Sequence, residues 1–359
     1  MRVRHGLVIG KFYPPHAGHH LLVRTAAALS ERLTVLVMAA HTEEIGLEPR
    51  VAWMRDAHAA LANVTVSGVW DDIPVDYNDD AIWRAHVDLM VRGASAVTDV
   101  PVDAVFTSEA YGDELGARLG CRHVLVDVAR ELVPVSGTAV RRDLVGSWDF
   151  LESPVRGGLA RRVVLVGAES TGKTTLAGDL VERLRARGGA HGLTRGVPEY
   201  GRAYTVDALA LARAGARLRG EPDPALDALP WPTSAFESIA RTQNAHEDAA
   251  AREGGPVLVC DTDAFATGIW HERYVGAPSP AVDAHGRSAD LYLLTHPDDV
   301  PFGQDGLRDG EAVRRWMTDR FVERLDATGR RWEWLRGGRE TRVENGLRAI
   351  DAVLARGWR

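Results

Sequence analysis

Short, continuous apolar runs that alternate with longer helical patterns constrain the fold of this chain more than any other feature. Four of these runs lie in the first half of the chain, at 6–10, 33–40, 103–108 and 123–128. Helical patterns at 19–32 and 111–119 lie between them. A strand that is apolar along its whole length is buried on both faces, as in a parallel sheet with helices on either side. The pattern therefore predicts an α/β fold built on a doubly wound parallel sheet.

The alternation stops in the Pro/Gly-rich segment 151–160 and then begins again. A second series of apolar runs follows, at 161–167, 256–260 and 290–295. A long helical pattern, ending at about Arg187, comes after the first of them. We therefore predict two doubly wound parallel-sheet domains, with residues 1–157 in the first and 158–359 in the second.

The second domain contains two segments rich in Gly, Pro and Ala, 213–235 and 275–288, which we expect to form loops or lids. A last helical pattern begins at about Arg339. Its apolar face is formed by Leu347, Ile350 and Leu354.

Net charge and cysteine content limit the class of protein. The net charge of the chain is -7, so no overall positive field favours nucleic acid or an anionic membrane. No apolar run approaches the ~18 residues of a membrane helix. Two cysteines, Cys121 and Cys260, cannot build a disulfide framework. We expect a cytoplasmic protein that binds neither nucleic acid nor membrane.

Lysine is rare in this sequence: only Lys11 and Lys173 occur among 43 basic residues. Lys173 lies in GAESTGKTT (167–175), which follows a predicted strand, opens a predicted helix and fits the phosphate-loop motif. Backbone N–H groups of such a loop surround a polyphosphate, and lysine adds a flexible point charge that the arginine fork does not replace. The motif predicts an ATP site formed by Gly167, Glu169, Ser170, Thr171, Gly172, Lys173, Thr174 and Thr175.

The Mg²⁺ that accompanies ATP needs oxygen ligands beside this loop. Thr174 offers a hydroxyl group. Asp261 follows the apolar run 256–260 and offers a carboxylate at the carboxyl edge of the sheet. We therefore predict that Thr174 and Asp261 bind Mg²⁺. Asp263, two residues further on, could face the substrate or the metal.

The other lysine lies in GKFYPPHAGHH (10–20), which also follows a predicted strand and opens a helix. Lys11, His16, His19 and the helix N-terminus would converge there on anionic oxygen, and Gly18 permits a close backbone approach. Zinc binding is a less favoured alternative, because helical zinc pairs usually lie at i and i+4 and no third ligand cluster is present. A purely structural role for the two histidines is a second alternative.

The same stretch resembles the H-x-G-H motif of the nucleotidyltransferase superfamily. The superfamily's second motif, S-x-T-x-x-R, is matched by Ser136, Thr138 and Arg141 in VSGTAVRRDL. The resemblance implies a Rossmann-like domain that transfers a nucleotidyl group from ATP to a phosphate and releases pyrophosphate. It implies catalytic roles for Lys11, His16, His19 and Arg141. The nucleotide would contact Gly10, Phe12, Gly18, Ser136 and Thr138.

Together, the two domains resemble the bifunctional nicotinamide-nucleotide adenylyltransferase/ribosylnicotinamide kinase family (NadR type). Further stretches carry the resemblance: FTSEAYGDELGARLG, VDVARELVPVSGTAVR, PEYGRAYT, DTDAFAT and QDGLRD. It implies that the second, P-loop kinase domain phosphorylates nicotinamide riboside to its mononucleotide, NMN. The first domain would then join NMN to AMP, making NAD. Implied ligands are ATP, nicotinamide riboside, NMN and NAD, and homo-oligomerisation is left open.

A kinase of this kind needs a base for the riboside hydroxyl, and we predict Glu199, with Asp263 as the second candidate. The substrate would contact Arg202 and, in the first domain, Trp83. A lid that carries Asp305, Arg308 and Arg314 is expected near the phosphates. Some relatives carry an aromatic residue where this chain has Pro198. The stacking partner of the riboside ring is therefore sought among Trp231, Phe236, Trp270 and Tyr204.

Three other functions are weighed. A riboflavin kinase/FMN adenylyltransferase pair is disfavoured, because its kinase half lacks a phosphate loop. A kinase with a regulatory nucleotide-binding first domain remains an alternative. An NAD-responsive regulator is less favoured, because the predicted first strand begins near Met1 and no basic helix suited to a DNA groove is evident.

Overall fold

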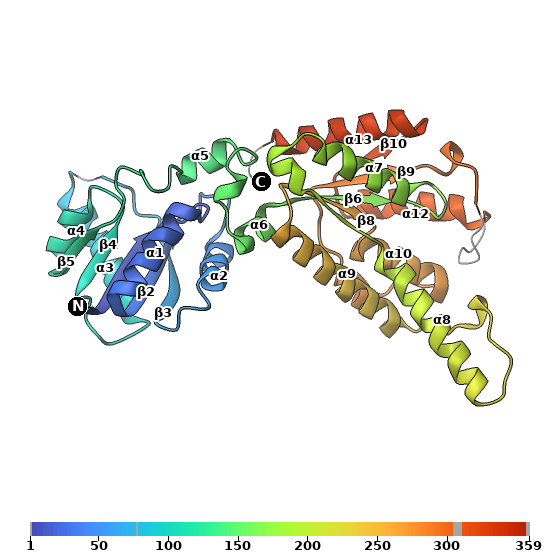
Figure 1. Cartoon of the computed structure of the whole chain (residues 1–359), viewed down its shortest axis with the longest axis horizontal. Helices are drawn as coiled ribbons and strands as arrows, with labels where there is room; N and C mark the ends of the chain where they lie inside the picture. Colours follow the sequence, from blue (N-terminus) through green and yellow to red (C-terminus); the bar gives the residue numbers. More distant parts are fainter. Residues whose placement is uncertain (1, 77, 304–310, 357–359) are drawn as a thin grey trace. The chain divides into compact units, whose positions relative to one another are not determined.

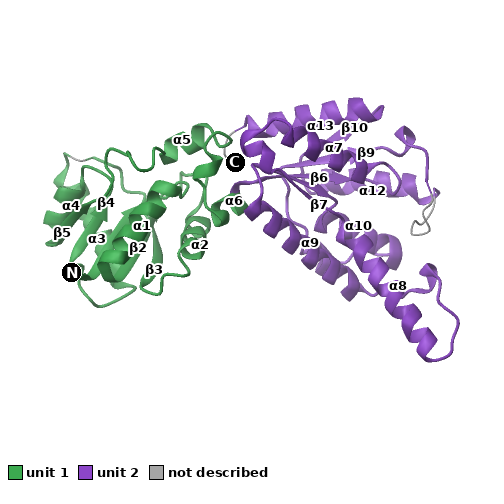
Figure 2. Ribbon diagram, viewed as in Figure 1, with its two compact units in different colours: residues 1–158, 357–359 green, residues 159–356 purple. Residues whose placement is uncertain are grey.

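The structure is a computed structural model that describes residues 2–76, 78–303 and 311–356. Two compact units divide the chain between Gly158 and Leu159 (Figure 2). Asp305 and Arg308, two of the predicted lid residues, lie outside the described residues.

The N-terminal unit is built on a parallel sheet with the strand order β3-β2-β1-β4-β5 (Figure 1). Its described strands are β1 (Val3–Gly10), β2 (Ser30–Ala39), β3 (Val64–Trp70), β4 (Ala104–Thr107) and β5 (Arg122–Leu125). Chain order runs outward from β1 to β3 and then returns to the other side of β1. That reversal places the topological switch point between β1 and β4, where open α/β sheets bind ligands.

Helices cover both faces of this sheet. Leu22 and Val23 of α1 (Ala17–Leu29) pack with Met54 of α2 (Leu47–Ala57) in one hydrophobic core. Met90 of α3 (Asp80–Ser95) and Leu115 of α4 (Gly112–Leu119) belong to a second core. Two further helices complete the unit, α5 (Gly137–Arg142) and α6 (Ser153–Leu159). The described residues thus form the doubly wound arrangement expected from the apolar strands.

The C-terminal unit repeats this architecture with the strand order β10-β9-β6-β8-β7, again all parallel. Its described strands are β6 (Arg161–Val166), β7 (Arg195–Val197), β8 (Val257–Asp261), β9 (Leu291–Thr295) and β10 (Trp332–Leu335). Its longer helices are α7 (Lys173–Arg185), α8 (Tyr200–Leu218), α9 (Thr233–Glu253), α10 (Ala264–Val275), α12 (Val313–Ala327) and α13 (Arg339–Leu354), and the short α11 spans Pro280–Asp283.

The core of this unit includes Leu180 of α7 and Ile350 of α13. Leu347 and Leu354, the other two residues of the expected apolar face, pack against it partly buried. The last helical pattern is therefore held in place by that face.

Two expectations about local structure need correction. The segment 213–235 is not all loop, because α8 continues to Leu218 and α9 begins at Thr233. The segment 275–288 includes the short helix α11, which Ser279 caps by accepting a hydrogen bond from Val282 N. Alanine-rich sequence favours helix over loop, and this preference prevails in α8.

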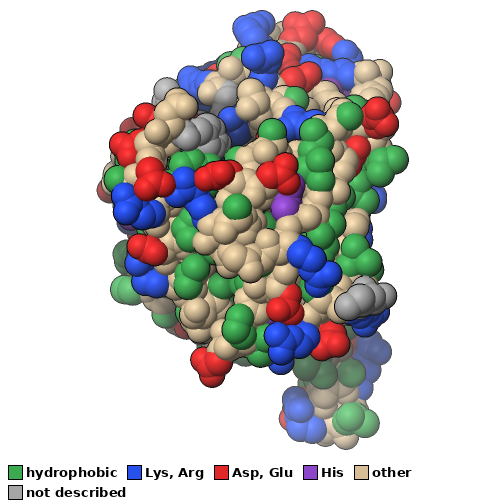
Figure 3. Space-filling view, turned by 90° about the vertical axis from the view of Figure 1, so that its left-hand side faces the viewer, with side chains coloured by type: hydrophobic (Ala, Val, Ile, Leu, Met, Phe, Trp, Pro, Cys, Tyr) green, Lys and Arg blue, Asp and Glu red, His purple; other side chains and the backbone are tan. Residues whose placement is uncertain are grey.

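No helix in the described part of the chain combines the length and apolarity needed to cross a lipid bilayer. On the face drawn in Figure 3, acidic and basic side chains are interspersed. This mixture accords with a small net charge.

Candidate active sites

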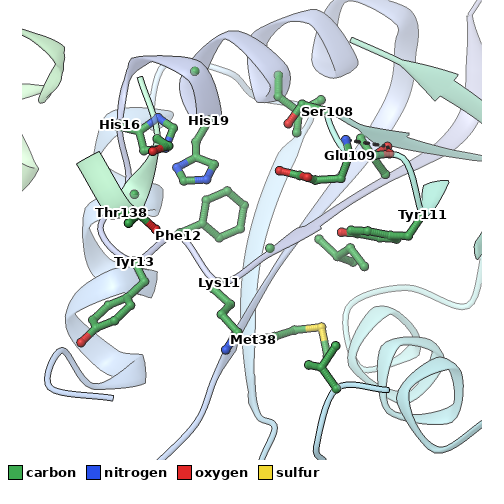
Figure 4. Close-up of a pocket in the computed structure, with 18 of the residues that line it drawn as sticks. Lys11, Phe12, Tyr13, His16, His19, Met38, Ser108, Glu109, Tyr111 and Thr138 are labelled. Carbon is green, nitrogen blue, oxygen red and sulfur yellow. Dashed lines mark hydrogen bonds between the residues drawn. The ribbon is translucent and has the colours of Figure 1, made fainter. Parts of the chain in front are cut away.

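The first candidate site is a cavity of about 530 Å³ at the switch point of the N-terminal sheet. Gly10 at the end of β1 and Thr107 at the end of β4 both line it. All the residues predicted for this domain's site line the same cavity: Gly10, Lys11, Phe12, His16, Gly18, His19, Trp83, Ser136, Thr138 and Arg141. Figure 4 labels Lys11, Phe12, His16, His19 and Thr138 among them. The two motifs, 120 positions apart in the sequence, are thus brought together by the fold.

His16 and His19 lie against each other at the start of α1, with ring centroids 3.7 Å apart. Burial, with smaller contributions from His20 and Arg130, lowers the pKa of His16 to about 3. Burial likewise holds the pKa of His19 well below its usual value. Within the described residues, neither Nδ1 atom has a hydrogen-bond partner, although both are buried. A buried polar atom without a hydrogen-bond partner is unfavourable. The two neutral imidazoles are therefore suited to bind an anionic ligand that enters the cavity.

Small residues make this arrangement fit. A Cβ atom at Gly18 would lie 3.2 Å from Cε1 of His16, and one at Gly137 would lie 2.7 Å from the Tyr13 carbonyl oxygen. Ser136 caps α5 by accepting a hydrogen bond from Ala139 N at 3.1 Å. The absence of a side chain at Gly137 thus lets the S-x-T-x-x-R segment lie close to Tyr13, in the turn that precedes His16.

Lys11 and Arg141, two cations of the site, have hydrogen-bond partners within the described residues. Lys11 Nζ donates to Glu43 Oε1 at 2.9 Å. Burial opposes ionisation of Glu43, but hydrogen bonds from Lys11 and Arg50 outweigh it and hold its pKa below the usual value. Arg141 donates to Tyr13 O and to Thr138 Oγ1, at 2.5 and 3.3 Å.

Sequence reasoning missed several charged residues of this cavity, among them Glu43 and Arg130. Arg130 lines the cavity and pairs with Glu109 at 3.4 Å, and its charge acts on both His16 and His19. Glu43 lies outside the stretches quoted for the family resemblance, and Arg130 lies within one of them, VDVARELVPVSGTAVR, but was given no role there. Only the folded chain brings both residues to the cavity.

Replacing Lys11 by arginine should lower kcat/KM for adenylyl transfer by about 5- to 10-fold, because a planar fork held by Glu43 follows moving phosphate oxygens poorly. Riboside phosphorylation by the same sample serves as the control and should not change. Unchanged adenylyl-transfer kinetics would contradict our explanation of why lysine is kept at position 11.

Acid should destabilise the N-terminal unit. The pKa values of His16, His19 and His20 are all lowered in the folded chain by burial, so the unfolded chain binds protons more readily below pH 6.5. The stability that these neutral histidines contribute is therefore fully present above pH 6.5 and is lost as the pH drops toward 3. At one pH unit below 6.5, each histidine lowers the free energy of unfolding by up to about 1.4 kcal/mol. Urea unfolding at pH 7.0 and 5.5 measures the loss, and a His20→Gln variant should show a smaller one. If wild type and His20→Gln lost the same unfolding free energy between pH 7.0 and 5.5, this prediction would be wrong.

The second candidate site is a cavity of about 1080 Å³ around the loop between β6 and α7. Predicted residues from four segments line it: Glu169, Ser170, Thr171, Gly172, Lys173, Thr174, Thr175, Glu199, Arg202, Trp231, Phe236 and Trp270. Gly167 and Asp261 are not among the lining residues, but both contact residues of the loop.

Glycine is required at both ends of this loop. Gly167 has a φ of 141° and Gly172 a φ of 84°, a region that other residues rarely adopt. A Cβ atom at Gly167 would also lie 2.4 Å from Thr295 Oγ1. Lys173 Nζ donates to the carbonyl oxygens of Gly167 and Ala168, both at 2.9 Å. The ammonium group is thus held at the mouth of the loop, where a polyphosphate would lie.

Thr174 and Asp261 fit a magnesium site. Thr174 Oγ1 donates to Asp261 Oδ2 at 2.5 Å, so the hydroxyl and the carboxylate already lie together. Among the described residues, the other carboxylate oxygen, Asp261 Oδ1, is buried without a hydrogen-bond partner. The described residues hold no cluster of three or more His, Cys, Asp or Glu side chains suited to a metal. A hard cation held by one hydroxyl, one carboxylate and phosphate oxygens agrees with both observations.

Glu199 lies between β7 and α8 and lines the cavity. Burial, together with the charge of Asp261, raises its pKa, while Lys173 and Arg202 oppose the rise. A carboxylate with a raised pKa beside the phosphate loop suits a general base.

Asp263, the second candidate for the base, has a different role in the structure. Its Oδ1 accepts from Ala266 N at 2.9 Å and caps α10, and its Oδ2 accepts from Tyr292 OH at 2.8 Å. Burial raises its pKa to about 6. Asp263 does not line the cavity, because both of its oxygens are committed to β9 and α10.

Arg314, predicted to reach the transferring phosphoryl group, is buried instead. One nitrogen of its guanidinium donates to the carbonyl oxygens of Pro297, Val300 and Ser170, at 2.7, 2.9 and 3.3 Å. Arg342 of α13 donates to Thr171 O at 3.0 Å and was not anticipated. Both arginines therefore donate hydrogen bonds to carbonyl oxygens of the phosphate loop, and neither lines the cavity.

Several aromatic rings line this cavity together. The Trp231 ring centroid lies 5.2 Å from that of Tyr274 and 5.8 Å from that of Phe236. The ring centroid of Tyr204, one of the expected candidates, lies 6.2 Å from that of Trp231, but Tyr204 does not line the cavity. Tyr274 was missed, because no motif marks it.

Residues 162–342, half of the chain, match the AAA domain family. The chain belongs to the AAA domain family. Residues 7–143 match the cytidylyltransferase-like family.

Relatives extend the similarity to both units. The trifunctional NAD biosynthesis/regulator protein NadR of Escherichia coli K12 is 25% identical over 367 residues, which cover 97% of this chain and 82% of that protein. The nicotinamide-nucleotide adenylyltransferase of Methanoculleus marisnigri is 26% identical over 152 residues, or 42% of this chain and 85% of that protein.

A crystal structure of NadR protein in complex with NAD and AMP-PNP shares the fold, with a TM-score of 0.69 at 20% identity. The match covers 99% of this chain and 98% of the other. These findings confirm the expected resemblance to NadR-type proteins and the expected pair of α/β domains.

Proposed function

We propose that the chain is a bifunctional enzyme of NAD biosynthesis. The C-terminal unit phosphorylates nicotinamide riboside with ATP, and the N-terminal unit joins the product, NMN, to AMP from a second ATP. One observation supports the proposal: each of two cavities is lined by residues predicted for one of the reactions, Lys11, His16, His19 and Arg141 in the first, and Lys173, Thr174 and Glu199 in the second.

In the C-terminal unit, the riboside 5′-hydroxyl attacks the γ-phosphorus of ATP, and ADP leaves. Glu199 accepts the hydroxyl proton, and Lys173 stabilises charge on the transferring group. Mg²⁺ held by Thr174 and Asp261 would neutralise charge on the phosphate oxygens. The cationic nicotinamide ring would lie against Trp231, Phe236 and Tyr274, since aromatic faces attract cations.

In the N-terminal unit, a phosphate oxygen of NMN attacks the α-phosphorus of ATP, and pyrophosphate leaves. His16 and His19 lie at the N-terminus of α1, and Lys11 and Arg141 flank them. We assign these groups to positioning the triphosphate and to stabilising charge that develops during transfer. Arg130 faces the same histidines and adds a further positive charge. Trp83 is the candidate stacking partner of the nicotinamide ring.

A chromatographic time course with pure protein, Mg-ATP and nicotinamide riboside tests the proposal. NMN should appear first and NAD afterwards. Accumulation of NMN without NAD would leave the kinase assignment intact and support a regulatory N-terminal unit. If the riboside is not phosphorylated, the proposed function is wrong.

A further inference from the structure

The first turn of α8 donates a hydrogen bond to a side chain of another helix. Glu199 is the residue immediately before α8, and within the described structure its side chain makes no capping bond to the helix. The N–H group of Tyr200, the first residue of α8, instead donates to Gln243 Oε1 of α9 at 3.0 Å. N–H groups at the start of a helix lack partners inside the helix. Gln243 supplies a hydrogen-bond acceptor for Tyr200. The Glu199 carboxylate is therefore not used as a helix cap and stays available to the cavity.

The Gln243 side chain is itself held in one orientation. It is 1% exposed, and its Nε2 donates to Glu247 Oε1, one turn further along α9, at 3.3 Å. Burial, reinforced by the nearby Asp263, raises the pKa of Glu247 to about 8. Glu247 therefore accepts this bond mainly as a neutral acid at pH 7. Because the amide nitrogen faces Glu247, the amide oxygen must face Tyr200.

Other contacts join the same parts of α8 and α9. The Tyr200 and His246 rings meet edge to face, with centroids 5.4 Å apart. Gln243 also lines the kinase cavity with Glu199 and Lys173. Position 243 thus lies where the start of α8 meets the cavity.

We propose that Gln243 is a positioning residue for riboside phosphorylation, which it serves by anchoring Tyr200 and thereby fixing the preceding Glu199 beside Lys173 and Asp261. This inference rests on the proposed kinase function. Gln243 acts through Glu199 and need not touch the reacting atoms. Glu247 in turn fixes which way the Gln243 amide faces.

Gln243→Met tests the inference, because methionine has a similar shape but makes neither hydrogen bond. We expect kcat for riboside phosphorylation to fall about 10- to 100-fold while KM for ATP stays within about twofold, as expected when a catalytic group is misplaced. Gln243→Glu can still accept from Tyr200 but cannot donate when ionised, and it should retain intermediate activity. Hydrogen exchange of the Tyr200 amide, measured without substrates, should be faster in Gln243→Met.

Asn244→Leu is the matched control, because Asn244 is a buried neighbour on α9 whose amide donates to His285 O at 3.0 Å. It should lower thermal stability without changing kcat or exchange at Tyr200. Equal kcat losses in the two variants, or unchanged exchange at Tyr200, would overturn the inference. A wild-type protein that does not phosphorylate the riboside would instead overturn the proposed function, and the exchange result would still stand. If Gln243→Met does not fold, Gln243→Glu decides by kcat alone: a partial loss of kcat that Asn244→Leu does not show supports the inference, and a wild-type kcat overturns it.

Discussion

Lys173→Ala should reduce riboside phosphorylation by about 100- to 1000-fold, the loss typical of removing one fixed charge donor from a transition state. Lys173 Nζ lies on the carbonyl oxygens of Gly167 and Ala168, at the mouth of the phosphate loop. No other lysine lies in the C-terminal unit. Adenylyl transfer from added NMN should be nearly unchanged, because its residues line a different cavity. Steady-state assays of both reactions on one preparation measure the two effects.

The same substitution should alter the pH dependence of any remaining kinase activity. The charge of Lys173 opposes the raised pKa of Glu199, so its removal should raise that pKa further. Since Glu199 acts as a base when ionised, the acidic limb of the kcat profile should move to higher pH. Arg183→Ala, an exposed change on the same helix, is the control and should leave both reactions as they are. Loss of both reactions in folded Lys173→Ala protein would refute separate sites.

His19→Ala should have the converse effect, with adenylyl transfer reduced about 100- to 1000-fold and riboside phosphorylation preserved. The His19 ring lies between Phe12, at 4.9 Å, and His16, at 3.7 Å. The substitution removes one imidazole that would bind the nucleotide. It also removes the stacking partner of His16. Incubation with riboside and ATP should therefore accumulate NMN.

His41→Ala is the matched control for this experiment. His41 stacks on Trp70 in the same unit, with centroids 3.9 Å apart, and does not line the cavity. Its replacement should leave adenylyl transfer within about twofold of wild type, because exposed side chains outside a site contribute little. If His19→Ala keeps full adenylyl transfer, the H-x-G-H motif is not the site of that reaction.

Most of the candidate site was predictable, because the motifs are local. A phosphate loop needs small residues and one lysine within nine positions, and the H-x-G-H motif needs two histidines on one helix turn. Both depend on short-range backbone geometry that the sequence specifies. The strand before each motif was also predictable, since it is buried on both faces and therefore uniformly apolar.

Strands with weaker patterns were missed. β3 contains Ser67 and Gly68, and β10 is the four-residue stretch Trp332–Leu335. Both lie at sheet edges, where one side carries no neighbouring strand and the sequence is less constrained. Their pairing is decided by contact with β2 and β9, which are distant in sequence.

By itself, the sequence determined the two parallel-sheet units, the two phosphate-binding motifs and the helix that follows each, because these depend on local periodicity and backbone shape. Only the tertiary structure decided how the remaining charged and polar groups are used. It assigned Asp263 to a helix cap and Arg314 to loop carbonyls, and it brought Arg130 to the histidines and Gln243 to Tyr200. The physical reason is that a buried polar group must find a partner, and that partner is supplied by whichever distant segment packs against it.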